Sequence, residues 1–145
     1  MTLCCFKYNK FKLNKRTLEN TLKYDFKGKI YLSKVLSVYD GDTITVAIKL
    51  DKHYFQRRIR MYGYDSPEMK PLKKLKNRDE IIKNAKIAKH VLEEKILNKI
   101  VECHIIGFDK YGRILANIIC SEENINDFML KSGYGYEYFG GKKNP

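Results

Sequence analysis

The chain has 145 residues and a formal net charge of +12, with 29 Lys and Arg against 17 Asp and Glu. This length suits one domain with its own core, and a composition of 43% hydrophobic and 32% charged residues excludes an intrinsically disordered chain. There is no apolar run of about 18 residues, which excludes a transmembrane helix. The basic excess indicates a polyanionic partner, with nucleic acid ahead of an anionic membrane surface.

The N-terminal part of the chain is basic and lacks a recognisable secretory signal, so we expect an intracellular protein, cytoplasmic by default. Residues 1–29 contain eight Lys or Arg and two acidic residues, and we expect an extension that packs on the domain or contacts an anionic partner. Two alternatives stay open, a lipid anchor at Cys4 and Cys5 and a cleaved N-terminus that targets an organelle. Neither the four cysteines nor the three histidines have zinc-site spacing, and we expect Cys103 and Cys120 to be packed free thiols.

Three β-strands are expected next. Residues 30–38 are rich in β-branched and aromatic residues and stop at Asp40-Gly41, which is a hairpin signal. Residues 43–50 alternate between apolar and polar side chains, and residues 54–62 follow a second turn at Asp51-Lys52. Three strands joined by short turns predict a β-meander.

An amphipathic helix is expected after these strands. It begins near Asn77, with Glu80 placed as in a capping box, and its apolar residues recur at steps of three and four. Two more strands, residues 101–106 and 114–119, flank a tight turn, and a short helix covers residues 125–131.

This order of elements predicts a β-barrel with helices, of the α+β class. Five strands with a helix between the third and fourth are typical of the five-stranded OB-fold Greek-key barrel, here with a short C-terminal helix. We expect residues 30–145 to form this domain, behind the extension of residues 1–29. Fold alone does not define the chemistry, which depends on particular residues.

Two acidic turns carry the first candidate residues. Asp40-Gly41-Asp42-Thr43 follows the first strand, and Asp65-Ser66-Pro67-Glu68 follows the third. Each alone is ordinary turn chemistry. In a meander, however, the ends of the first and third strands lie at the same end of the sheet, so Asp42 and Asp65 can converge. Their oxygen ligands suit calcium or magnesium rather than zinc or copper.

Two arginines and a glutamate complete a plausible phosphate site. Arg60 lies five residues before Asp65 on the same strand, and Arg113 follows the Gly112 turn. Both guanidinium groups can reach a phosphate that bridges the metal, and positioned positive charge is what stabilises a phosphoryl transition state. Glu68 is suited to act as general base towards an attacking water.

Three motifs resemble the staphylococcal nuclease-like (thermonuclease) family. They are Asp-Gly-Asp-Thr at residues 40–43, Arg60 five residues before Asp65-Ser66-Pro67-Glu68, and Asp109-Lys110-Tyr111-Gly112-Arg113. They occur in the family's order over about residues 34–133. Members of this family are calcium-dependent phosphodiesterases that cleave DNA and RNA and leave 3′-phosphate ends. The resemblance therefore implies Ca²⁺ as cofactor and single-stranded or flexible DNA and RNA as partners; we expect a monomer.

The resemblance also implies a role for each matching residue. Asp42, Asp65 and the backbone carbonyl of Ser66 would bind calcium, and Glu68 would position or deprotonate water. Arg60 and Arg113 would clamp the phosphate, and Lys110 and Tyr111 would contact a neighbouring phosphate. Tyr136 and Tyr138 are approximate counterparts of the tyrosines that pack on the base in the family. Asp40 and Thr43 would orient Asp42 and hold metal-bound waters.

Two other functions stay as alternatives. The first is a catalytically inactive OB-fold module that binds nucleic acid, as in degenerate copies of this family, which typically lack some of the acidic residues and arginines. All of them are present here, which favours the enzyme. The second is a barrel that binds an anionic membrane or a protein partner through residues 1–29.

Overall fold

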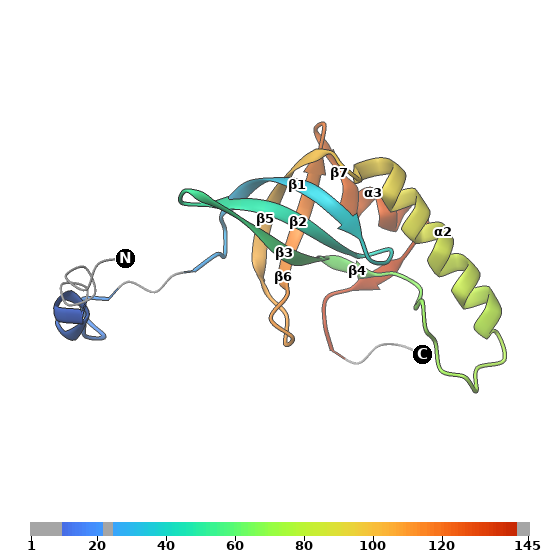
Figure 1. Cartoon of the computed structure of the whole chain (residues 1–145). Helices are drawn as coiled ribbons and strands as arrows, with labels where there is room; N and C mark the ends of the chain where they lie inside the picture. The colour runs from blue at the N-terminus through green and yellow to red at the C-terminus, as the bar shows by residue number, and fades with distance from the viewer. Residues whose placement is uncertain (1–9, 22–24, 142–145) are drawn as a thin grey trace.

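Five long strands form a closed β-barrel in the computed structural model, which describes residues 10–21 and 25–141. The sheet order is β3-β2-β1-β5-β6-β7, and a parallel pairing of β3 with β6 closes the barrel (Figure 1). The predicted five-stranded OB-type barrel with helices is confirmed. The sheet strands are β1 (Ile30–Val38), β2 (Thr43–Leu50), β3 (His53–Met61), β5 (Ile100–Phe108), β6 (Ile114–Cys120) and the short β7 (Glu123–Asn124).

The first two strands have the predicted bounds, whereas the third ends one residue early. Gly63 has a φ of 91°, a conformation that favours glycine, and it turns the chain out of β3 into a separate strand, β4 (Gly63–Asp65). A second, two-stranded sheet forms where β4 pairs with β8 (Tyr136–Tyr138). The aromatic tail of the sequence is therefore a strand that lies beside Asp65.

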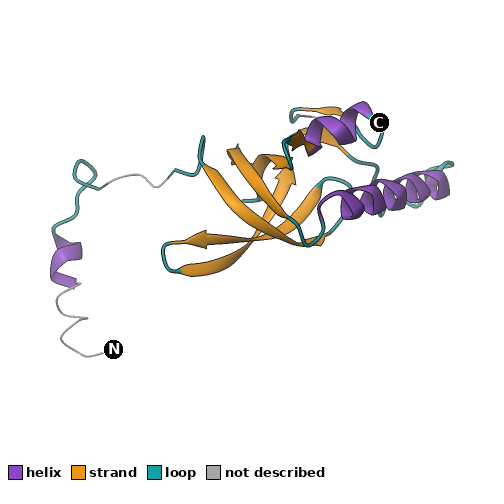
Figure 2. Cartoon of the chain, turned by 90° about the horizontal axis from the view of Figure 1, so that it is seen from above, coloured by secondary structure: helices purple, strands orange, loops and turns teal. Residues whose placement is uncertain are grey.

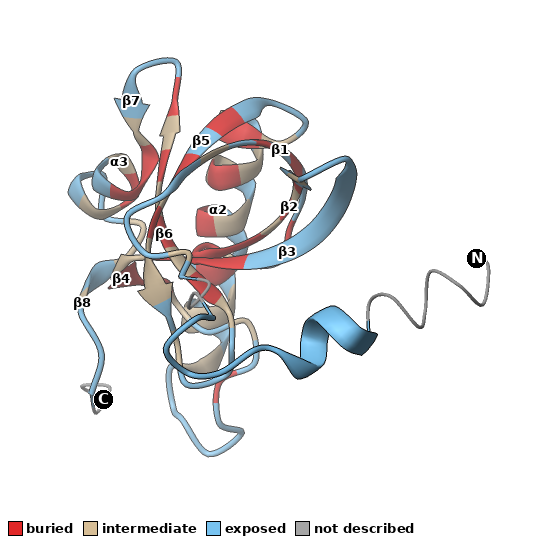
Figure 3. Cartoon of the chain, turned by 90° about the vertical axis from the view of Figure 1, so that its left-hand side faces the viewer, coloured by how far each residue is buried: buried red, intermediate tan, exposed pale blue. Residues whose placement is uncertain are grey.

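The helix α2 (Arg78–Ile96) lies at one side of the barrel and extends beyond it (Figure 2), and it buries an apolar stripe of Ala85, Ala88, Leu92 and Ile96. Buried residues line the inside of the barrel and the face of α2 that meets it (Figure 3). The predicted capping box is wrong. Asn77 has φ −99° and ψ 25°, outside the extended conformation of a capping residue, and its side chain makes no capping hydrogen bond.

The short helix α3 (Ile125–Lys131) has the predicted bounds and is capped by Asn124, which accepts a hydrogen bond from the Asp127 N–H at 3.2 Å. Cys103 and Cys120 are buried free thiols, as predicted. None of the helices within the described ranges is both long and apolar enough to cross a membrane.

The end of the predicted N-terminal extension belongs to the barrel. The Gly28 N–H donates to the Ile105 carbonyl at 2.8 Å, and the Ile105 N–H donates to the Lys29 carbonyl at 2.9 Å. Phe26 is half-buried against the core, whereas residues 10–21 are exposed. Cys4 and Cys5 lie outside the described residues. The domain division at residue 29, the monomeric state and the cellular compartment stay predictions.

Candidate active site

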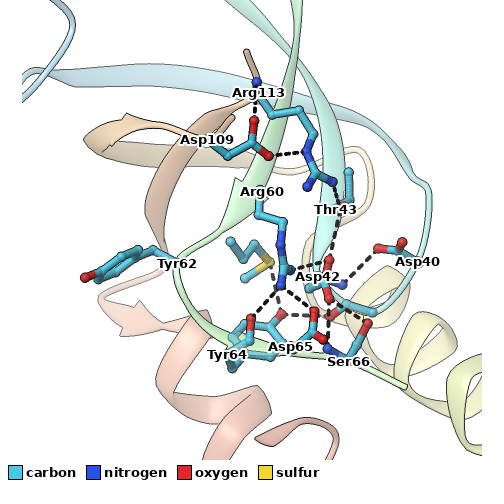
Figure 4. A network of polar contacts seen from close by, with 12 residues as sticks. Asp40, Asp42, Thr43, Arg60, Tyr62, Tyr64, Asp65, Ser66, Asp109 and Arg113 are labelled. Atoms are coloured by element: carbon cyan, nitrogen blue, oxygen red, sulfur yellow. Dashed lines mark hydrogen bonds and ion pairs between the residues drawn. The ribbon is translucent and has the colours of Figure 1, made fainter. Parts of the chain in front are cut away.

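Three segments meet at one end of the barrel, and strand register decides which residues face one another there (Figure 4). Thr43 at the start of β2 pairs with Arg60 near the end of β3, and Arg60 pairs with Leu115 of β6. The β1–β2 loop with Asp42 and the β5–β6 hairpin with Arg113 are therefore brought to opposite sides of Arg60.

Arg60 lies at the centre of the site and joins the two aspartates. Its Nη1 forms an ion pair with Asp42 Oδ1, and its Nη2 lies 2.5 Å from Asp65 Oδ1 and 3.0 Å from the Tyr64 carbonyl. The three side chains are at most 9% exposed. Burial alone would lower the pKa of Arg60, but the negative charges of Asp42 and Asp65 raise it above its ordinary value. The guanidinium is therefore permanently charged and tightly held.

Asp42 is fixed from several directions. Ser66 donates two hydrogen bonds to Asp42 Oδ2, from its backbone N–H and its hydroxyl, each at 2.8 Å. The Thr43 hydroxyl donates to Asp42 Oδ1 at 2.9 Å. Asp40 accepts a hydrogen bond from the Asp42 N–H at 3.2 Å, and burial together with the charge of Asp42 raises the pKa of Asp40 to about 6. Two loops far apart in sequence are thus joined through one carboxylate.

Gly41 permits this contact between the loops. A Cβ at Gly41 would lie 2.7 Å from the Ser66 Cβ and 2.9 Å from the Ala88 Cβ, closer than non-bonded carbons approach. The buried Tyr64 hydroxyl donates to the Gly41 carbonyl at 2.7 Å. Sequence reasoning assigned Gly41 to turn chemistry and did not single out Tyr64. A glycine flanked by two aspartates was the sequence signal for the close loop contact at Gly41. The sequence offered no signal for the hydrogen bond of Tyr64.

Asp65 has a second partner in the C-terminal part of the chain. Tyr136 pairs with Asp65 across the β4–β8 ladder, and its hydroxyl donates to Asp65 Oδ2 at 2.6 Å. Tyr138 donates instead to the Gly141 carbonyl at 2.9 Å. Sequence reasoning expected both tyrosines to pack on a base, and it did not foresee that Tyr136 orients a carboxylate. The packing of Tyr136 and Tyr138 on a base of the substrate stays a prediction.

Arg113 is held by the hairpin that carries it. Its Nε donates to Asp109 Oδ2 at 2.6 Å, its backbone N–H donates to Asp109 Oδ1 at 2.9 Å, and its Nη1 lies 3.4 Å from Thr43 Oγ1. Burial raises the pKa of Asp109, but the hydrogen bonds from Arg113 and from the Tyr111 N–H outweigh it and lower the pKa overall. Asp109 therefore stays ionised and aims Arg113. The four-residue spacing of Asp109 and Arg113 around the Gly112 turn was the sequence signal for this ion pair.

A cavity of about 550 Å³ unites these side chains. Of the twelve predicted site residues, all but Thr43 and Tyr136 line it, and those two contact residues that do. Glu68 is exposed at its edge, beside Pro67. Lys110 and Tyr111 are exposed on the hairpin, with Lys110 Nζ 5.0 Å from the centre of the Tyr111 ring. Residues from three segments that are far apart in the sequence therefore line one cavity.

The donor atoms of this cavity fit a hard cation. Asp42 and Asp65 each place a carboxylate oxygen against the Arg60 guanidinium, and the Ser66 N–H donates to Asp42, so two carboxylates and the Ser66 backbone lie together in the cavity. Within the described ranges, no three His, Cys, Asp or Glu side chains form a preformed metal cluster. Arg60 Nη1 is buried, and its ion pair with Asp42 is the charge contact that the structure shows for it.

Comparison with known proteins agrees with this geometry. A family model described as "Staphylococcal nuclease homologue" matches residues 58–145. A thermonuclease of Staphylococcus intermedius is 33% identical over 111 residues, which cover 75% of this chain and 60% of that protein. An uncharacterized protein of Bacillus anthracis is 36% identical over 105 residues (70% of this chain and 45% of that protein). A staphylococcal-like nuclease of Arabidopsis thaliana is 33% identical over 81 residues (56% and 22%). The chain spans less than two thirds of each of these relatives.

The fold and site define a small OB-type β-barrel with two acidic loops and two arginines around one cavity. The family model covers more than half of the chain, and the chain belongs to the staphylococcal nuclease-like family.

Proposed function

We propose that this protein is a calcium-dependent, sugar-nonspecific nuclease that hydrolyses DNA and RNA to products with 3′-phosphate ends. The observation that carries this proposal is the convergence of Asp42, Asp65, Arg60 and Arg113 on one cavity, in a surrounding of net charge +12. Acidic side chains inside a basic surface suit a cation that faces a phosphodiester. Family membership and relatives that are named nucleases support the same reaction class.

Calcium would be held by Asp42, Asp65 and the Ser66 carbonyl, and when bound it supplies positive charge beside the scissile phosphate. Thr43 and Tyr136 keep the two carboxylates in place through hydrogen bonds of 2.9 Å and 2.6 Å. Ligand oxygens that are already oriented lose little freedom when the ion binds, so these hydrogen bonds favour binding.

Arg60 and Arg113 would clamp the phosphate from two sides. Their planar guanidinium groups donate paired hydrogen bonds to phosphate oxygens, and this interaction strengthens as negative charge develops in the transition state. Asp109 aims Arg113, and the Asp42–Asp65 pair aims Arg60. Lys110 and Tyr111, on the same hairpin, would contact a neighbouring phosphate.

Glu68 would take a proton from the attacking water. It is exposed at the cavity edge, two residues after Ser66 in the acidic turn, so a water between Glu68 and the phosphate has room. The water oxygen would bond to phosphorus as the P–O5′ bond breaks, and the water proton would go to the Glu68 carboxylate. The leaving 5′ oxygen would take a proton from solvent, and the phosphate would stay on the 3′ side.

A digestion assay tests the proposal. Single-stranded DNA and RNA should be degraded in millimolar calcium and spared in chelator, and phosphatase treatment should release inorganic phosphate from the new ends. Glu68→Gln should lower kcat by roughly 10²–10⁴-fold. Equal digestion in chelator would refute the metal assignment. Tight binding without any cleavage in calcium would favour the alternative, an inactive module that binds nucleic acid.

A further inference from the structure

A second hollow of about 640 Å³ lies next to the candidate active site. It is bounded by the exposed start of β3, by the β5–β6 hairpin and by the segment that precedes β1. Two of its lining residues, Tyr111 and Arg113, also line the active-site cavity. The two hollows are therefore neighbours on either side of one hairpin. The lining residues that carry the argument are Phe26, Arg57, Arg58, Phe108, Tyr111 and Arg113.

The arginines of this groove are available to an anion. Arg57 and Arg58 are exposed, and neither forms an ion pair with a carboxylate of the described residues. The Arg57 guanidinium lies 5.6 Å from the Phe55 ring centre, and that of Arg58 lies 4.9 Å from the Tyr39 ring centre. Such stacking engages the flat face of a guanidinium. Arg57 Nη1 donates to the Gln56 carbonyl at 3.2 Å, and among the described residues no other hydrogen bond uses the in-plane N–H donors of the two arginines. No acidic residue is among those that line the groove; Asp109 is the ion-pair partner of its Arg113.

The aromatic residues of the groove are exposed in a way that suits a planar ligand. Phe108 is 48% exposed and Tyr111 is 73% exposed. Phe26 supports Phe108 from behind, with ring centres 5.7 Å apart in an edge-to-face arrangement. Aromatic faces that alternate with arginines are what proteins use to bind single-stranded nucleic acid, because only an unpaired base exposes its face for stacking.

We propose that this groove binds the nucleotides of a single-stranded substrate that lie beyond the scissile phosphate, with Arg57 and Arg58 on phosphates and Phe108 on a base. The inference rests on the nuclease function proposed above and narrows its substrate to single strands long enough to occupy both hollows. Tyr111 and Arg113 lie where the strand passes from one hollow to the other. Arg57 and Arg58 lie outside the three sequence motifs that resemble the family.

The double variant Arg57→Gln/Arg58→Gln tests the groove directly. Binding of a fluorescent single-stranded 12-mer should weaken, and the slope of log K against log salt should become shallower by about 1.4, since each phosphate contact on a single strand contributes about 0.7. The matched control is Lys83→Gln/Lys86→Gln, which removes the same charge from exposed positions on α2 and should change the slope by less than half as much. Equal slopes for the two double variants would overturn the proposal.

Short substrates separate the groove from the chemistry. A dinucleotide occupies only the active-site cavity, so its kcat/KM should be unchanged in Arg57→Gln/Arg58→Gln, whereas kcat/KM for the 12-mer should fall by about 10-fold through KM. Phe108→Leu, which keeps an apolar side chain against Phe26, should lower 12-mer affinity in the same direction. An equal loss on both substrates would refute a separate groove. If no variant cleaves any substrate but the binding differences persist, the nuclease proposal fails and the groove stands.

Discussion

Arg60→Gln should destabilise the protein as well as inactivate it, because Arg60 pairs with two buried carboxylates at once. Asp42 and Asp65 are 5% and 3% exposed, and both lie against the guanidinium. Breaking a buried ion pair by removing one partner costs about 3–5 kcal/mol, since the other charge stays buried. At about 3 °C per kcal/mol for a chain of this size, Tm in chelator should fall by ~10 °C.

Calcium should restore more stability to this variant than it adds to the wild type. At a calcium concentration of 100 times Kd, binding adds about 2.7 kcal/mol to the free energy of unfolding, provided that the unfolded chain does not bind. Without Arg60 the two carboxylates repel each other, so the ion relieves a repulsion that the wild type does not have. Arg60→Gln also removes a contact to the transition state, so kcat should fall by about 10²–10³-fold.

Thermal unfolding in chelator and in calcium, together with a digestion assay, measures all three effects. Arg58→Gln is the control, because it removes an exposed arginine two residues away on the same strand and should change stability by no more than about 0.5 kcal/mol. A loss below about 1 kcal/mol for Arg60→Gln in chelator would contradict the buried ion-pair network. Equal stabilisation of variant and wild type by calcium would contradict the proposal that Asp42 and Asp65 bind the ion.

Three further substitutions test separate features of the structure. Tyr136→Phe removes the 2.6 Å hydrogen bond to Asp65. It should weaken calcium affinity, measured by calorimetric titration, by about 10-fold and should change Tm little. Unchanged affinity would mean that the hydroxyl has no role in orienting the carboxylate. Gly41→Ala places a methyl group 2.7 Å from the Ser66 Cβ and should lower stability by about 1–3 kcal/mol and calcium affinity with it, and wild-type values for both would contradict the close loop contact. Burial raises the pKa of Cys103 from 9.0 to about 11, so the folded state holds a proton that the unfolded state has lost, and stability should decline as pH rises from about 9 through 11. Cys103→Ala should flatten that decline by on the order of 2 kcal/mol in denaturant titrations at pH 8 and pH 11, and an unchanged slope would refute the assignment.

The strands and helices were largely predictable from local patterns. Alternation placed β2 at its observed bounds, and the short helix predicted at residues 125–131 has the bounds of α3. The helix start was predicted from Asn77 and Glu80, but the capping box failed because the Asn77 backbone is not extended there. Local patterns report which residues are buried, whereas the backbone angles at a helix end depend on the loop that enters it.

The arrangement of the site was predictable only in part. The ends of the first and third strands of a meander lie together, so the sequence alone predicts that Asp42 is near Asp65. Tyr64 and Tyr136 could not be found in the same way, since their hydrogen bonds to Gly41 and Asp65 span 23 and 71 residues. Such contacts depend on how β4, β8 and the loops pack, and no short-range pattern encodes them.

The sequence by itself determined the chemistry that is available: oxygen ligands on two turns, arginines at set spacings from them, and a basic chain around both. Only the tertiary structure decided that Arg60 lies buried between Asp42 and Asp65, that Asp109 aims Arg113, and that an aromatic and basic groove continues the cavity. The physical reason is barrel closure. The parallel pairing of β3 with β6 sets Arg60 beside the hairpin that carries Arg113, and this pairing joins residues more than 50 positions apart.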